Sequence, residues 1–221
     1  MPGTGIAPEP AMKLRPLLLT LLVLPGTQGC KPMLYPVARA FGGPSESELK
    51  LRRAAFDRLK AARATAKVLV YPALRPAHPE REAYLATAGL AVELLQGYGW
   101  AHCQAASAPP TIPATPLMRN QLSYVQTRAR AYSEWAKTAR PEADFLVILE
   151  VLVRPEGGIV GVHCYVLEAS GQVAYARQFN SHHFGASSID LPANAVGFAL
   201  RELSWDVQRP ADQVHPPYGV G

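Results

Sequence analysis

Apolar residues recur with a period close to 3.6 in four segments of the chain, which predicts four amphipathic helices. They cover residues 45–67, 80–96, 117–140 and 190–207. A capping box at residues 45–48 opens the first helix, and Asp190 is the expected cap of the last. The same periodicity assigns Arg52 and Arg128 to the solvated sides of the first and third helices, and Trp205 to the inner side of the last.

Shorter apolar runs between these helices predict strands. Residues 67–71 form a short buried strand that ends at a proline, and residues 99–103 form a weaker one. The run at residues 143–153 is almost continuously apolar, as in a central strand covered on both faces. Turn residues separate it from runs at 159–169 and 172–183. We therefore expect an α/β (α+β) domain, a mixed sheet with a C-terminal three-strand antiparallel meander and helices packed on it.

The amino-terminal part of the chain has the form of a secretory signal peptide. Lys13 and Arg15 precede an apolar run at residues 17–24, and small residues lead from there to Cys30. A membrane-spanning helix needs about 20 apolar residues, so this shorter run is expected to be removed and not to anchor the chain. Because signal peptides carry their positive charge at the very beginning, Met12 is the expected start.

Composition divides the chain into four parts. Residues 1–29 are the predicted signal peptide, residues 30–44 a tether, residues 45–207 a single α/β domain, and residues 208–221 a disordered tail. The net charge of +5 falls to +4 once the signal peptide is removed. An excess of this size is compatible with an anionic surface but is too small to indicate nucleic acid as a partner.

The expected cleavage site resembles the lipobox of bacterial lipoproteins, in which small residues precede a cysteine that is acylated and becomes the new amino terminus. Gly29 and Cys30 match that pattern, whereas Thr27 and Gln28 differ from the usual residues. The resemblance implies lipidation of Cys30, and Lys31 after it favours the outer membrane. The alternative is ordinary cleavage at the same bond, which gives a soluble secreted protein.

Four short segments carry a second resemblance. They are VLVYP at residues 68–72, the helix end LLQGY at 94–98, ADFLV at 143–147 and the turn EASGQV at 168–173. Their order resembles the layout of small periplasmic lipoproteins of the group that includes curli-secretion lipoproteins, penicillin-binding-protein activators and the amino-terminal domain of TolB. Members with an assigned role bind partners in the envelope, so the resemblance implies an interaction module and not an enzyme.

The candidate chemical groups are three cysteines and a pair of histidines. If Cys30 carries lipid, Cys103 and Cys164 are a candidate disulfide, unless Cys164 is simply a small buried residue of its strand. His182 and His183 are adjacent on a predicted strand and face opposite sides, which disfavours a shared metal. The spacings typical of zinc sites, phosphate loops and nucleophile elbows do not occur, so no catalytic, cofactor-binding or metal residue is assigned.

These patterns favour a membrane-anchored periplasmic lipoprotein, a non-catalytic module of the cell envelope that binds another envelope protein or associates with itself. The loop at residues 105–116 is long enough to be mobile, and the sheet edge beside it is expected to receive the partner, since exposed edges accept added strands. Two alternatives stay open. One is a periplasmic hydrolase that uses residues 180–190, and the other is a carrier of a small ligand or metal.

Overall fold

A computed structural model describes residues 43–76, 83–113, 115, 121–154, 157–180 and 191–209. In this part of the chain the helices are α2 (Glu46–Ala62), α3 (Ala86–Gly97), α4 (Gln121–Ala139) and α5 (Pro192–Gln208). The strands are β1 (Lys67–Val70), β2 (Ala73–Leu74), β3 (Ala83–Tyr84), β4 (His102–Ala105), β5 (Phe145–Val153), β6 (Ile159–Glu168) and β7 (Val173–Asn180). The predicted signal peptide, Cys30, most of the tether, the tail from residue 210, His182, His183 and Asp190 lie outside these residues.

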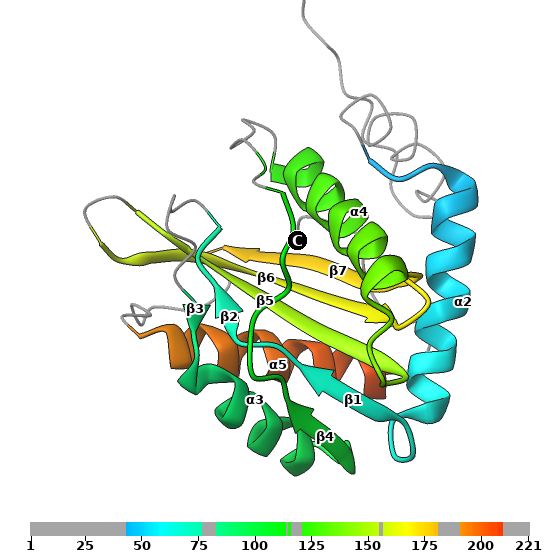
Figure 1. Ribbon diagram of the computed structural model, residues 1–221, viewed down its shortest axis with the longest axis horizontal. Helices are drawn as coiled ribbons and strands as arrows, with labels where there is room; N and C mark the ends of the chain where they lie inside the picture. Colours follow the sequence, from blue (N-terminus) through cyan, green and yellow to red (C-terminus); the bar gives the residue numbers. More distant parts are fainter. Residues whose placement is uncertain are drawn as a thin grey trace, which may run out of the picture.

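The protein is an α/β domain with a mixed sheet, as the sequence predicts (Figure 1). The strands β4, β1 and β5 are parallel neighbours, and β6 and β7 continue from β5 in antiparallel pairing. β2 follows β1 along the same side of β5 and carries β3 on its own outer side. The predicted three-strand meander is therefore β5, β6 and β7.

Helices cover both faces of the sheet. Because side chains alternate along a strand, Val147 and Leu149 of β5 point into one core and Leu146 and Ile148 into the other. The first core is packed by α2, α3 and α5, and the second by α4 and the segment that precedes it. The long apolar run that predicted a strand covered on both faces is confirmed, since all of residues 145–151 are buried.

The helix boundaries differ from the predicted ones for local reasons. α2 ends at Ala62, whose carbonyl accepts the N–H groups of Thr65 and Ala66 in a tight turn before β1 begins. α3 begins later than predicted because Ala83 and Tyr84 are paired with β2. The N-cap residue of α5 is Leu191, with no side-chain cap bond, and not Asp190. The capping box at the start of α2 is confirmed.

For three side chains, the exposed or buried position predicted from helical periodicity is wrong. Arg52 and Arg128 are buried, at 3 % and 4 % exposure, although both were assigned to solvated faces. Trp205, assigned to an inner face, is 46 % exposed, because the buried stripe of α5 runs through Val196, Leu200 and Leu203. A polar or aromatic residue near the edge of a stripe is not assigned reliably by spacing alone.

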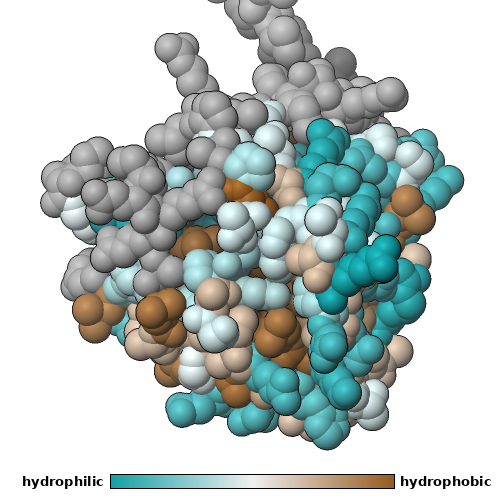
Figure 2. All heavy atoms as spheres, in the orientation of Figure 1, coloured by the Kyte–Doolittle hydropathy of each residue, from teal (hydrophilic) through white to brown (hydrophobic). Residues whose placement is uncertain are grey.

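The outer strands of the sheet, β7, β4 and β3, differ in what surrounds them. At the β7 edge, α2 and α4 pack on opposite faces and are joined by an ion pair between Arg130 and Glu48 at 3.2 Å. The outer surface of these two helices is mostly hydrophilic (Figure 2). On the opposite side of β5, β4 pairs with β1 and the two-residue β3 pairs with β2, and among the described residues no strand lies beyond either (Figure 1).

Gly171 in the β6–β7 turn and Gly99 after α3 should differ in how much an alanine substitution destabilises the protein. Gly171 and Gly99 both have a φ of +89°, but a Cβ on Gly171 would lie 2.6 Å from the Ser133 carbonyl oxygen of α4, whereas nothing lies within 4 Å at Gly99. We expect Gly99→Ala to lower the free energy of unfolding by about 1–2 kcal/mol through backbone strain, and Gly171→Ala by about 1–3 kcal/mol more. Urea unfolding of both variants measures the difference, and equal losses would contradict the close approach of α4.

Candidate functional site

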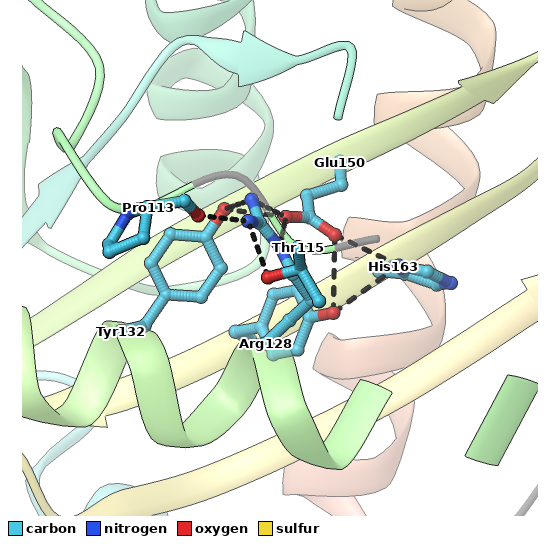
Figure 3. Close-up of polar contacts among 7 residues, drawn as sticks. Pro113, Thr115, Arg128, Tyr132, Glu150 and His163 are labelled. Carbon is cyan, nitrogen blue, oxygen red and sulfur yellow. Dashed lines mark hydrogen bonds and ion pairs between the residues drawn. The ribbon is translucent and has the colours of Figure 1, made fainter. Parts of the chain in front are cut away.

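The most unusual feature of the interior is a cluster of polar side chains between α4 and the sheet, the α4 cluster (Figure 3). Its members are Tyr124, Arg128 and Tyr132 of α4, Glu150 of β5, and His163 and Tyr165 of β6. The α4 residues are four apart, so they form one row on the helix. Glu150 and His163 are direct partners in the β5–β6 register, so both point to the same face of the sheet.

Glu150 is the centre of the α4 cluster. Its Oε1 accepts hydrogen bonds from Arg128 Nε and from the Tyr132 hydroxyl, each at 2.6 Å, and a second guanidinium nitrogen of Arg128 also contacts it. Its Oε2 accepts from the Tyr165 hydroxyl at 3.2 Å and lies 3.0 Å from His163 Nδ1. An ionised carboxylate only accepts, so Nδ1 is the donor of this last bond.

Burial and charge act in opposite directions on Glu150, which is fully buried. Burial by itself would raise the pKa of the Glu150 carboxyl, but the hydrogen bond from His163 and the charge of Arg128 outweigh it and lower that pKa. The same burial, together with the negative charge of Glu150, raises the pKa of Tyr124 to about 12. At neutral pH the cluster therefore contains a carboxylate paired with a guanidinium and surrounded by neutral phenols.

Arg128 connects the cluster to the segment that follows β4. Its Nη1 lies 3.4 Å from both the Pro113 carbonyl oxygen and the Thr115 hydroxyl oxygen. Earlier in the same segment, Ile112 is 4 % exposed and packs in the second core. The described part of this loop is thus attached to the interior at its far end.

The α4 cluster contains residue types that serve as acids, bases and anion-binding groups in enzymes. All six residues of the cluster are at most 4 % exposed. A substrate would therefore have to displace described residues to reach their side chains. The contacts join α4, β5, β6 and the segment after β4. The α4 cluster therefore has a structural role: its hydrogen bonds and ion pair fix how these elements lie on the sheet.

Unlike the buried α4 cluster, the outer side of β4 is not paired with any described strand. Val70 accepts a hydrogen bond from the Ala106 N–H at 2.8 Å, and Val70 and Ala105 are register partners. Alternate residues of a parallel strand turn their N–H groups to opposite sides, so those of Cys103 and Ala105 point away from β1. Two backbone donors thus face the open side of the sheet, just before the segment that Arg128 holds.

The structure does not contain the candidate disulfide. Cys103 on β4 and Cys164 on β6 are both free and buried. The strands β1 and β5 lie between them, so at about 4.8 Å per strand their Cα atoms are at least about 14 Å apart, beyond the reach of a disulfide. Burial raises the pKa of Cys103 to about 11 and also raises that of Cys164. Neither thiol is therefore a reactive nucleophile at neutral pH.

Other predicted groups are not brought together in the described part of the chain. There, no three His, Cys, Asp or Glu side chains form a group that could hold a metal. Asn180 ends β7, but residues 181–190, on which the hydrolase alternative depends, lie outside the described residues. None of the described helices is long and apolar enough to cross a membrane.

The sequence contained one signal for the α4 cluster that periodicity missed. Glu150 is the single charged residue in the run FLVILEVLV of β5. A carboxylate in a strand that is buried on both faces requires a cationic or hydrogen-bonding partner. Arg128, between Tyr124 and Tyr132 on one helical row, fits that requirement, but nothing in the sequence says that this row faces Glu150.

The α4 cluster predicts strong coupling between Arg128 and Glu150. Either Glu150→Gln or Arg128→Met leaves a buried charge without its partner, and we expect each to lower the free energy of unfolding by about 3–5 kcal/mol. The double variant removes both charges and should be more stable than the sum of the single effects by about 2–3 kcal/mol. Urea unfolding of the four proteins measures this coupling energy.

The exposed pair between Arg130 and Glu48 is the matched control, because it involves the same helix. Its side chains are 55 % and 33 % exposed, so the corresponding cycle should give a coupling of at most about 1 kcal/mol. Similar coupling energies in the two cycles would contradict the role assigned to Glu150.

No protein-family model matches the chain, and no curated protein sequence does. The function must therefore be argued from the residues and the fold.

Proposed function

We propose that this protein is a membrane-anchored lipoprotein of the bacterial periplasm, acting as a non-catalytic interaction module of the cell envelope. Its partner is another envelope protein or a second copy of the chain. The partner contributes an extended segment that adds to the sheet at β4. The observation that carries the proposal is that β7 lies between two helices, whereas no described residue pairs with the outer side of β4; β3, the other outer strand, has only two residues.

The open side of β4 has the properties that strand addition requires. The N–H groups of Cys103 and Ala105 point outward, and backbone groups of this kind bind an incoming strand irrespective of its sequence. His102, Gln104 and Ala105 are exposed, and their side chains are small or polar. The strand has only four residues, which limits unwanted pairing and favours a partner that adds contacts elsewhere.

The chain that follows β4 starts at this edge and is fixed at its far end (Figure 1). The chain leaves β4 at Ala105 and is held in the second core by Ile112 and Pro113. Because Arg128 holds the far end of this segment near β5, the loop that leaves β4 is fixed at both ends, which reduces the entropy lost when a partner binds beside it. The α4 cluster thus supports docking without touching the partner.

The membrane anchor in this proposal is supported by the leader sequence. The basic start, the short apolar run and the Gly29–Cys30 step indicate export and acylation of Cys30. Acylation with two or more chains holds a protein at a membrane far more firmly than a single chain does. The partner would then be sought among proteins of the same membrane surface, with the outer membrane favoured by Lys31.

The anchor is tested by Cys30→Ala. We expect the wild-type protein to incorporate radiolabelled palmitate and to fractionate with membranes, and the variant to lose the label entirely. Cys30→Ser is a second variant of similar size and should behave in the same way. An unlabelled wild-type protein found in the soluble fraction would contradict lipidation and would favour ordinary cleavage at the same bond.

The docking edge is tested by Ala105→Pro. Proline removes an N–H that points away from β1 and leaves the β1 ladder intact, so we expect the protein to fold and to lose its partner. A photo-crosslinking residue in place of Gln104 reports the contact in cells. Its adduct should fall at least about tenfold in the Ala105→Pro background, since one lost backbone hydrogen bond and a clash cost at least about 1.4 kcal/mol.

Two controls accompany this experiment. Ala105→Val adds bulk but keeps the N–H, and it should retain most of the adduct. The same crosslinker in place of Lys50, whose side chain is 78 % exposed on α2, should give no adduct of that mass. An adduct that is unaffected by Ala105→Pro, or that forms equally from Lys50, would contradict strand addition at β4.

A further inference from the structure

The outer face of α5 carries an exposed aromatic residue between two arginines, which we call the α5 stripe: Phe198, Arg201, Trp205 and Arg209. Their spacing of three or four residues puts them on one side of the helix. Trp205 is 46 % exposed, so nearly half of a large apolar ring faces outward. Phe198 also packs on the first core, whereas the exposed ring of Trp205 is not explained by the buried side of α5.

The two arginines are ordered on the aromatic rings. The Arg201 guanidinium carbon lies 5.0 Å from the centre of the Phe198 ring and 5.1 Å from that of Trp205. The Arg209 guanidinium carbon lies 5.9 Å from the Trp205 ring on its other flank. Each guanidinium also has one carboxylate beside it, since Arg201 Nη2 lies 3.5 Å from Glu202 Oε1 and Arg209 Nη1 lies 3.9 Å from Asp206 Oδ1. A guanidinium has five N–H donors, and stacking through its face uses none of them, so one such pair leaves other donors for an anion.

The charge exposed by the stripe is positive. The Arg201 and Arg209 side chains are 45 % and 40 % exposed, whereas the nearby carboxylates of Glu202 and Asp206 are 19 % and 1 % exposed. Asp206 is already bound to Arg177 at 2.6 Å. Lys60 of α2 adds a further cation, since its Nζ donates to the Arg209 carbonyl oxygen at 2.5 Å.

We propose that the α5 stripe is a membrane-contact surface that binds the phosphate headgroups of anionic phospholipid, with Trp205 inserted at headgroup level. Tryptophan is enriched at the membrane–water interface because one part of its ring is apolar and its N–H is polar. Cations beside it are attracted to anionic lipid. The stripe presents both features together on one helix face.

The reach of the tether agrees with this assignment, which rests on the proposed acylation of Cys30. Gly43, the first described residue, lies 13 residues after Cys30, so the tether spans at most about 45 Å. α2 is 17 residues long and spans about 25 Å from there to the end that carries Lys60. An anchored domain can therefore turn the stripe to the same membrane that holds its lipid. The open edge of β4 is formed by other residues and can bind its partner at the same time.

The test uses residues 31–221, which keep every described residue and lack Cys30, so the result does not depend on the anchor. Both cores are built from residues 43–209, and thermal unfolding verifies the fold of each variant. The probes are vesicles of phosphatidylcholine with or without phosphatidylglycerol. We expect binding in the presence of phosphatidylglycerol only, with a blue shift of tryptophan emission and loss of binding at high salt.

Arg201→Gln with Arg209→Gln should weaken partitioning roughly 25-fold, since each cation near the surface is worth about a factor of five. Trp205→Phe should abolish the blue shift, because Trp100 is fully buried and Trp135, the third tryptophan, packs against Tyr71 in the second core, on the opposite face of the sheet from α5. Leu51→Ala is the matched control, since Leu51 is 56 % exposed on α2 away from the stripe, and it should bind as the wild type does.

Failure to bind phosphatidylglycerol vesicles at low salt would overturn the proposal, as would binding that the double arginine variant leaves unchanged. A crosslinker in place of Trp205 that yields a protein adduct in cells, together with no vesicle binding, would show that the stripe is a protein interface instead. None of these results bears on Cys30, whose anchor is judged by palmitate labelling and fractionation.

Discussion

The buried carboxylate of Glu150 is the constraint on which the arrangement of this domain depends. A charge at the centre of a strand covered on both faces is tolerated only when it is neutralised and fully hydrogen-bonded. Four side chains from α4 and β6 meet that requirement: Arg128, Tyr132, His163 and Tyr165. Each of these bonds also fixes an element, so one electrostatic requirement sets the position of α4 and the path of the segment after β4.

This constraint links the interior to the proposed docking surface. Apolar contacts hold α4 on the sheet, but they are not directional. The hydrogen bonds of Arg128 are directional, because its guanidinium contacts Glu150 on one side and Pro113 on the other. The segment that follows β4 is thus held by Arg128 at its far end, while no described residue pairs with the outward N–H groups of β4.

The two proposed binding surfaces of the domain differ in their chemistry. The β4 edge presents backbone hydrogen-bond donors, which suit an extended protein segment. The α5 stripe presents an exposed indole and two guanidinium groups, which suit a phosphate-bearing surface. An anchored module with both surfaces can stay oriented at a membrane and still receive a partner, which is consistent with a role in envelope assembly.

The sequence by itself determined the order of the four helices and of the longer strands, the meander and the capping box of α2, because these follow from periodicity and local turn chemistry. It missed β2 and β3, whose two residues each are too few to show a period. It also indicated that Glu150 needed a partner. Only the tertiary structure decided that this partner is Arg128, that Cys103 and Cys164 are separated by two strands, and that Trp205 faces outward. The reason is physical: periodicity defines which residues share a face of an element, but strand order and helix placement decide what that face meets.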